Sequence, residues 1–258
     1  MKSLYAALVF FTRLPFWRLY NPPAEAFKSI VNYWWFAGII TGGIMAAGYF
    51  AAAHLFPALI AAIVAVVLRL LATGALHEDG LADLCDGFGG GTTRERILAI
   101  MKDSFIGSYG VIGLIIYFLL LCSAIAALPR EVAPYVILFG DIFSKALSAH
   151  IIQLLPYARK EEESKAKVVY VKMSLLFLLI NLVVMAASLL LLHHFVAPYM
   201  CNLGWRQVAL LALVPVILFL LLIALMKRRI GGYTGDCCGA LFLLCELSFY
   251  LTFTTFAL

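Results

Sequence analysis

Three aspartates near residue 80 are the side chains best placed to do chemistry. Asp79, Asp83 and Asp86 are spaced four and three residues apart, so on a helix continuing from the preceding apolar run they share one face, about 5–6 Å apart at Cβ. Two carboxylates at about 6 Å repel by roughly 3 kcal/mol at an effective dielectric of about 20. A divalent cation bound between the carboxylates makes their interaction favourable. Ligands that are all oxygen favour Mg²⁺, or alternatively Mn²⁺, over zinc. The stripe predicts a metal site; the alternative is a solvated acidic helix end.

A glycine-rich run and a short basic segment follow the stripe. Thr92 and Glu95 have the spacing of a capping box, which predicts a helix from residue 93 to about residue 103. Asp86 and Asp103 are candidates for a catalytic base, and either could also bind metal. The candidates for phosphate binding in this segment are Arg94, Arg96 and Lys102. Carboxylates and cations together indicate phosphoryl or nucleotidyl transfer.

Polar residues elsewhere could complete the site. His77 precedes the stripe and is rotated away from it, so a substrate contact and a structural hydrogen bond both stay open. Thr234 and Asp236 lie in a tight turn before the last apolar run and are substrate-binding candidates. Lys145 follows Asp141 by four residues within an apolar run. Because intramembrane charges are costly, Lys145 either lines a substrate cavity or neutralises Asp141.

A second intramembrane pair is predicted from depth. Arg69 lies seven residues, roughly 10 Å along a helix, from one end of its apolar run, and Glu246 lies seven residues beyond Gly239 in the last run. We expect the two side chains to pair directly or to share one polar cavity. The alternative is that Arg69 reaches the surface alone.

The composition determines which elements can position these residues. The chain has 258 residues, of which 64% are hydrophobic and 13% charged, and its mean hydropathy is +1.01. A soluble fold of this size cannot bury so much apolar surface. A soluble domain and a disordered chain are therefore excluded, and a net charge of +5 is too small to suggest nucleic-acid binding. The lipid bilayer is the solvent that this chain fits.

Seven apolar runs approach the roughly 20 residues that a membrane-spanning helix needs. They lie near Ile30–Leu55, Pro57–Leu76, Tyr109–Leu128, Val132–Leu155, Val171–His193, Arg206–Met226 and Gly239–Leu258. Residues 4–12 form a shorter run, typical of an interfacial or re-entrant helix. We find no internal repeat and no linker, so we expect an all-α, polytopic integral membrane protein with one domain over residues 1–258.

The basic residues predict the orientation in the membrane. Of nineteen lysines and arginines, fifteen lie in the N-terminal segment and in alternate loops, two in the other loops and two within the apolar runs. The positive-inside rule then places the N-terminus and segments 77–108, 156–170 and 227–238 in the cytoplasm. The loop at about 77–108 is the expected cytoplasmic active-site loop.

Three stretches of the sequence resemble a known family. The central one, Thr73–Gly110, contains L-H-E-D-G-L-A-D-x-x-D-G-x-G-G-G; the early one is F-F-T-R-L-P (Phe10–Pro15), and the late one is G-G-x-T-G-D (Gly231–Asp236). In this order they resemble the cobalamin synthase family, also called adenosylcobinamide-GDP ribazoletransferases. The chain departs from the family pattern at Phe105 and Lys145, where arginine is usual.

The resemblance implies an integral enzyme of the bacterial cytoplasmic (inner) membrane, acting in the last steps of vitamin B12 assembly. Such an enzyme joins adenosylcobinamide-GDP to α-ribazole, or to its 5′-phosphate, releases GMP and requires Mg²⁺. The expected partners are these small molecules and the lipid bilayer, with no nucleic acid. The oligomeric state stays open, a homo-oligomer included.

Two other classes stay open as alternatives. A CDP-alcohol phosphatidyltransferase also uses spaced aspartates at a membrane face, although Asp83 stands where its D-G-x-x-A-R pattern has arginine. An ion-coupled transporter could use Asp141, Lys145 and Glu246, although transporters often carry internal repeats, which we do not find here.

Overall fold

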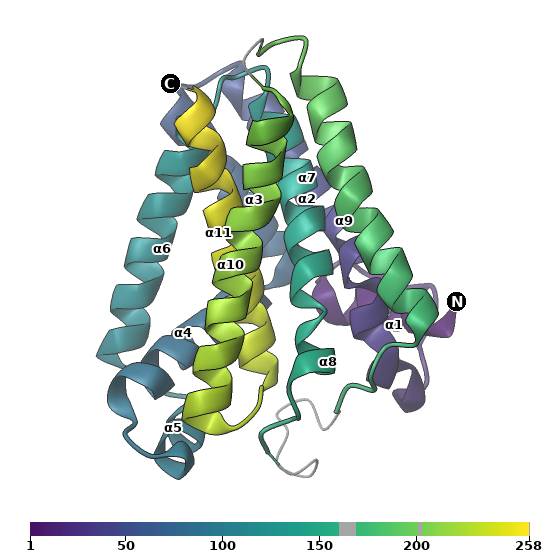
Figure 1. Cartoon of the computed structure of the whole chain (residues 1–258), viewed down its shortest axis with the longest axis vertical. Helices are drawn as coiled ribbons and strands as arrows, with labels where there is room; N and C mark the ends of the chain where they lie inside the picture. The colour runs from purple at the N-terminus through teal and green to yellow at the C-terminus, as the bar shows by residue number, and fades with distance from the viewer. Residues whose placement is uncertain (160–168, 201–202, 258) are drawn as a thin grey trace.

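The computed structural model describes residues 1–159, 169–200 and 203–257, and the regular elements within these ranges are helices (Figure 1). In chain order they are α1 (Lys2–Phe11), η1 (Phe16–Arg18), η2 (Ala24–Tyr33), α2 (Trp34–Ala53), α3 (Ala58–Thr73), α4 (Leu76–Gly90), α5 (Arg94–Ile100), α6 (Ser108–Ala126), α7 (Ala133–Ser148), α8 (Ile151–Leu154), α9 (Leu175–Val196), α10 (Trp205–Ile230) and α11 (Gly235–Ala257). Among the described residues six spans are long and apolar enough to cross a membrane, or seven if the bent pair α3–α4 counts as one. The predicted polytopic all-α membrane protein is confirmed.

Helices α7 and α11 form the centre of the bundle. About 78% of the apolar window of α7–α8 and 72% of that of α11 are buried, against 17% for α9 and 22% for α10. Figure 1 shows α6 and α9 on opposite outer sides of the bundle. Lipid tails are as apolar as leucine, so the exposed leucines of the outer helices need no protein partner. The buried ionic side chains Asp141 and Lys145 lie on α7, and Glu246 lies on α11.

The second apolar run bends sharply at Gly74 and Ala75. Both residues have left-handed backbone angles, with φ of 67° and 57°, and α4 turns away from α3 by 94°. Arg13 N donates to Ala72 O at 2.7 Å, and the Arg13 side chain lies against Gly74. The expectation that the aspartate stripe continues the preceding helix is therefore wrong, because two consecutive left-handed residues cannot extend a right-handed helix.

The short basic helix is also displaced from its predicted start. Its N-cap is Thr93, whose Oγ1 accepts a hydrogen bond from Arg96 N at 3.2 Å, and the helix runs from Arg94 to Ile100. The prediction that Thr92 forms a capping box is wrong, because Thr93 is the residue with the extended backbone (φ −110°, ψ 158°) that a helix N-cap requires.

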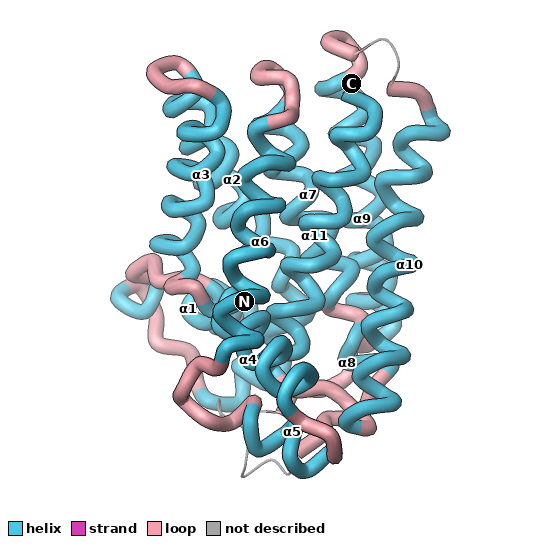
Figure 2. Tube along the Cα trace, turned by 90° about the vertical axis from the view of Figure 1, so that its left-hand side faces the viewer, coloured by secondary structure: helices cyan, strands magenta, loops and turns pink. Residues whose placement is uncertain are grey.

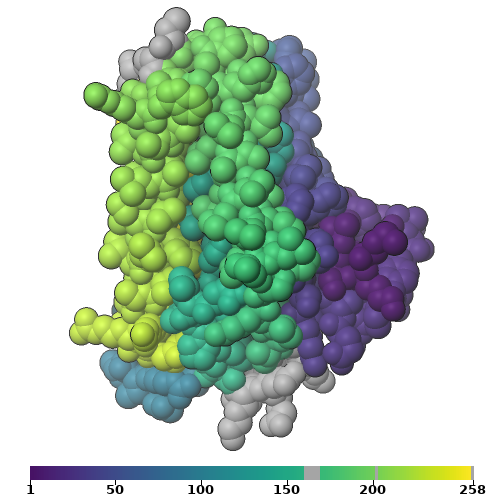
Figure 3. All heavy atoms as spheres, turned by 45° about the vertical axis from the view of Figure 1, so that its right-hand side comes forward, coloured from purple at the N-terminus to yellow at the C-terminus, as the bar shows by residue number. Residues whose placement is uncertain are grey.

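Helix α4 and the basic segments lie at one end of the bundle. Figure 2 shows α4, α5 and α8 at the end opposite the C-terminus. Figure 1 shows α10 ending and α11 beginning at the same end. The N-terminal segment forms a bulge beside the lower half of the bundle, purple in Figure 3. This end carries the polar residues that the sequence singles out.

Candidate active site

One cavity brings together three segments that are far apart in the sequence. The space between its walls is about 820 Å³, open solvent included. Each of the three stretches that carry the family resemblance contributes to its wall. The lining residues are Phe10, Phe11, Val31, Trp34, Leu76, His77, Asp79, Tyr157, Arg159, Tyr170, Gly235, Asp236, Cys238 and Gly239.

Helices α4 and α11 cross beside the cavity with their backbones almost in contact. A Cβ atom on Gly80 would lie 2.7 Å from Asp236 O, and one on Gly239 would lie 3.1 Å from His77 Cα. Glycine removes the side chains that would hold these helices apart. The crossing places Asp79 of the central stretch and Asp236 of the late stretch on the wall of the same cavity.

A small backbone pairing positions a cation at the cavity. Ala158 N donates to Tyr233 O at 2.8 Å, and Tyr233 N donates to Pro156 O at 2.9 Å. The neighbouring Arg159 lines the cavity while one of its guanidinium nitrogens donates to Leu98 O at 3.1 Å. No sequence motif singles out Arg159, because it lies in a loop with several other basic residues that the positive-inside rule explains.

Aromatic rings form the other part of the wall. The Trp34 and His77 rings are 5.7 Å apart with planes at 23°, and Phe11 stacks on Trp34 at 5.2 Å. Burial raises the pKa of the Tyr170 phenol well above its ordinary value, so this ring stays neutral. No sequence motif singles out Trp34 or Tyr170, whereas Phe10 and Phe11 belong to the early stretch that resembles the family.

The three aspartates of the predicted stripe have different surroundings. Asp79 is exposed on the cavity wall, and Asp83 is half-buried one turn along α4. Asp86 is buried, and its two carboxylate oxygens accept hydrogen bonds from Gly107 N at 2.7 Å and Gly110 N at 2.8 Å. It therefore stabilises the first turn of α6, as an acidic group at a helix N-terminus does. No three His, Cys, Asp or Glu side chains within the described ranges are grouped as metal ligands.

The predicted cationic residues are not gathered at the cavity. Arg94 donates to Ile230 O and Ala158 O, each at 2.8 Å, and so ties α5 to the end of α10 and to the segment before Arg159. Arg96 and Lys102 are exposed and are not among the residues that line the cavity. Arg94 thus holds together the three polar segments that the sequence places on one side of the membrane.

Two further site candidates stabilise local structure. Thr234 Oγ1 accepts a hydrogen bond from Cys237 N at 3.3 Å at the start of α11, and its hydroxyl also donates to Asp236 Oδ2 at 3.3 Å. Asp103 is exposed after α5, where Oδ1 accepts a bond from Phe105 N at 3.2 Å. The structure places Asp103 outside the cavity lining and Thr234 directly behind it.

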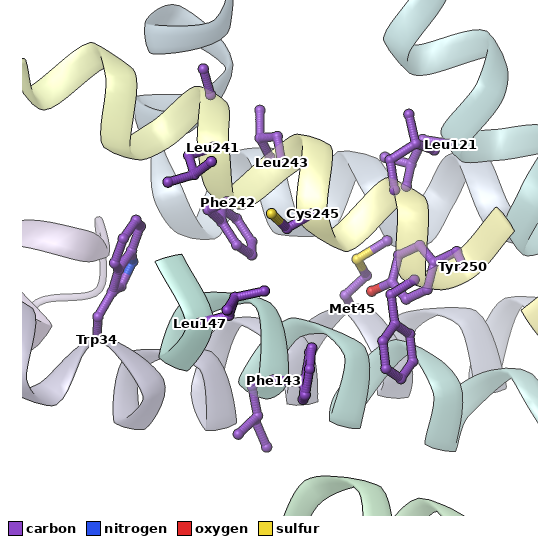
Figure 4. Packing of buried hydrophobic residues seen from close by; sticks show 14 of the residues in the cluster. Trp34, Met45, Leu121, Phe143, Leu147, Leu241, Phe242, Leu243, Cys245 and Tyr250 are labelled. Atoms are coloured by element: carbon purple, nitrogen blue, oxygen red, sulfur yellow. The ribbon is translucent and has the colours of Figure 1, made fainter. Parts of the chain in front are cut away.

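Lys145 is paired inside the bundle. Its ammonium forms an ion pair with Asp141, donates to Thr41 Oγ1 at 2.9 Å and lies 4.0 Å from the centre of the Phe242 ring. Figure 4 shows Phe242 pointing from α11 towards α7, near Leu147. Of the two alternatives for Lys145, the geometry matches neutralisation of Asp141, and Lys145 does not line the cavity.

The predicted pairing of Arg69 with Glu246 is confirmed. The Arg69 guanidinium donates to Glu246 Oε2 at 2.5 Å and to Tyr117 Oη at 2.8 Å, and Glu78 Oε1 lies 3.5 Å from it. Tyr250 Oη donates to the other oxygen of Glu246 at 2.8 Å. This buried network, which we call the Arg69 network, joins α3, α4, α6 and α11.

Comparisons with known proteins identify the family of the chain. The family described as Cobalamin-5-phosphate synthase matches residues 3–254. The chain is 37% identical to the adenosylcobinamide-GDP ribazoletransferase of Shewanella amazonensis over 97% of this chain and 94% of that protein. It is 34% identical to the Vibrio cholerae serotype O1 protein of the same name, covering 99% and 94%, and 35% identical to that of Shewanella woodyi, covering 100% and 97%. No solved structure matches significantly. The chain belongs to the cobalamin-5-phosphate synthase family.

Proposed function

We propose that this chain joins adenosylcobinamide-GDP to α-ribazole, or to its 5′-phosphate, with release of GMP, and that the reaction takes place in the cavity beside α4 and α11. The relatives that match over nearly their full length are named for this transfer. The observation that carries the proposal is the meeting of all three family-like stretches at one cavity with two aspartates and an arginine.

The donor set at the cavity fits Mg²⁺. Asp79 and Asp236 both line it, and Asp83 lies one turn from Asp79 on α4. Mg²⁺ is usually held by one or two carboxylates together with substrate phosphates and water, so a cluster of three protein ligands is not needed. Mn²⁺ has the same preference for oxygen ligands. When bound there, the ion would offset negative charge on the pyrophosphate.

The chain's own residues supply orientation, a base and a cation. In the proposed reaction a ribose hydroxyl of α-ribazole attacks the phosphorus that bears cobinamide, and the bond to the GMP phosphate breaks. Asp79, with Asp83 one turn away on α4, would hold the metal, and Asp236 would accept the hydroxyl proton. Arg159 is placed to offset charge on the departing phosphate, an electrostatic role that is usually the largest contribution in such sites. Asp103, Arg96 and Lys102 stay predictions for substrate contacts outside the cavity lining.

A purified-protein assay tests the function. The full chain in detergent is incubated with adenosylcobinamide-GDP and α-ribazole, and GMP and the cobalamin product are measured. We expect product with either Mg²⁺ or Mn²⁺. We expect no product after chelation until a metal is restored. GMP release without a cobalamin product would indicate hydrolysis and contradict the transfer. A parallel flux measurement in liposomes separates an enzyme from a carrier.

We also propose that the cavity faces the cytoplasm from the bacterial inner membrane. The basic residues of α5 and of the end of α10 lie at the cavity end, and the positive-inside rule assigns such an end to the cytoplasm. Single cysteines introduced at positions 94 and 131 provide a matched pair from the two ends. In intact cells an impermeant thiol reagent should label position 131 and not position 94. The opposite pattern would reverse the orientation.

A further inference from the structure

Two residues that line the cavity carry buried ring nitrogens without a hydrogen-bond partner among the described residues. Trp34 is 2% exposed and His77 is 3% exposed, and both residues line the cavity wall. Trp34 Nε1 and His77 Nε2 have no hydrogen-bond partner among the described residues. A buried polar atom left without a partner costs about 1–3 kcal/mol, so such atoms beside a cavity indicate a ligand that completes them.

The rings that carry these nitrogens stack with Phe11 into an apolar aromatic wall beside the cavity. The Phe11, Trp34 and His77 rings are near parallel, with interplanar angles of 12° to 23°, and the edge of Phe242 closes one side at 4.9 Å from His77. Because the indole N–H lies in the ring plane, a planar ligand that accepts from it meets the Trp34 ring at its edge and contacts apolar rings around it. Trp34 Nε1–H can only donate, whereas His77 Nε2 donates or accepts according to the tautomer.

We propose that the wall formed by Phe11, Trp34 and His77 is the binding subsite for the planar base of the acceptor nucleoside, with Trp34 Nε1–H donating to the unsubstituted ring nitrogen of that base. This inference rests on the proposed function, in which the acceptor is α-ribazole. The ligand class is a bicyclic, largely apolar heteroaromatic base with one acceptor nitrogen and no donor. The single acceptor nitrogen of such a base matches the single indole N–H of Trp34, and its apolar surface matches the apolar wall.

The alternative occupant is the guanine of adenosylcobinamide-GDP, and two observations favour the acceptor base. Guanine presents several donors and acceptors at its edge, and burying them against this wall would leave most of them without partners. In the acceptor the attacking hydroxyl belongs to the ribose attached directly to the base, whereas a ribose and a phosphate separate guanine from the reacting phosphorus. His77 and Asp79 both line the same cavity, so the aromatic wall and a proposed metal ligand share one site.

The test combines a variant of the protein with a variant of the substrate. Trp34→Phe keeps a ring in the wall and removes the indole donor. An indole riboside, in which CH replaces the acceptor nitrogen, removes the matching acceptor. We expect Trp34→Phe to raise KM for α-ribazole about fivefold to tenfold, the loss of one hydrogen bond, and to leave KM for adenosylcobinamide-GDP unchanged. The wild-type protein should prefer α-ribazole to the indole riboside, and Trp34→Phe should lose that preference.

Trp35→Phe is the matched control. Trp35 Nε1 is also buried without a partner among the described residues, but Trp35 does not line the cavity. This variant should keep both KM values within about twofold. His77→Phe should also raise KM for α-ribazole, and a thermal unfolding measurement on every variant identifies one that fails to fold.

The outcomes separate the subsite from the function. A wild-type protein that forms no cobalamin product contradicts the proposed function itself. An active protein whose Trp34→Phe variant raises KM for adenosylcobinamide-GDP instead assigns the wall to guanine and overturns this inference. A Trp34→Phe variant that still discriminates against the indole riboside overturns it too, even if its stability falls, because a purely structural role does not depend on the substrate's ring nitrogen.

Discussion

The cavity and the Arg69 network are both rich in polar groups, but the partners of those groups differ. In the network, Arg69, Glu246, Tyr117 and Tyr250 bind one another, so their charges and hydroxyls are compensated inside the protein. At the cavity, Trp34 and His77 leave ring nitrogens without partners among the described residues. Buried atoms without a hydrogen-bond partner also occur in the network, at Arg69 Nε and the Glu78 carboxylate. The two regions therefore differ in position: Trp34 and His77 line a cavity that a ligand can enter, whereas Arg69 and Glu78 do not line it.

Removing the cation of the network should give the largest effect on stability. Arg69→Met leaves Glu246 and Glu78 buried without their shared counter-charge, which costs about 3–5 kcal/mol when one partner of a buried pair is lost. We expect a marked fall in the thermal unfolding midpoint in detergent. Arg228→Met, at an exposed position near the end of α10, is the control and should unfold like the wild-type protein. Equal midpoints for both variants would show that the network does not stabilise the fold.

Removing a carboxylate of the cavity should affect turnover instead. Asp79→Asn loses a proposed metal ligand at an exposed position, so we expect turnover to fall by at least about a hundredfold while the fold is kept. Mg²⁺ should raise the unfolding midpoint of the wild-type protein and raise that of the variant much less. Glu95→Gln is the same chemical change at an exposed residue of α5 and should keep full activity. Turnover by Asp79→Asn above a tenth of the wild-type rate would argue against the metal role.

The crossing of α4 and α11 links the two regions, and a single methyl group tests it. Gly80→Ala places a Cβ 2.7 Å from Asp236 O, so the helices must separate, at a cost of about 1–3 kcal/mol. Gly43→Ala in α2 meets no atom within 4 Å and should be neutral or stabilising by up to about 1 kcal/mol. Unfolding midpoints and turnover of both variants are the measurements. If Gly80→Ala lowers neither, the close crossing does not set the site.

Replacing Asp86 should give the smallest effect, because its carboxylate accepts hydrogen bonds at the start of α6 and does not line the cavity. Asp86→Asn replaces a carboxylate that accepts from Gly107 N and Gly110 N with a single amide oxygen. We expect a loss of about 1 kcal/mol of stability, as for a weakened helix cap, and turnover within tenfold of the wild-type rate. Complete loss of turnover in a stable protein would return Asp86 to the metal site that its spacing predicts.

The membrane environment, the apolar helical runs and the family of this chain can be predicted from the amino-acid sequence alone. Long apolar runs can satisfy their backbone groups in lipid only as helices, and the depth of Arg69 and Glu246 along those helices predicts their pairing, because an isolated charge there is too costly. The motif that contains Asp79 and Asp83 also marks the end of the molecule at which the cavity lies. These are properties of single segments or of their depth in a membrane.

Contacts between polar side chains on different helices follow from how the helices bend and pack, and so they appear only in the folded structure. The helical spacing of Asp79, Asp83 and Asp86 predicts one shared role, but the bend at Gly74 and Ala75 and the packing of α6 give Asp86 to a helix terminus. Arg94, expected at phosphate, binds backbone carbonyls instead, while Arg159 and Trp34 reach the cavity from segments with no recognisable motif. Spacing along a chain fixes neighbours on one helix; the partners of a side chain across helices depend on bends and glycine contacts that periodicity does not encode.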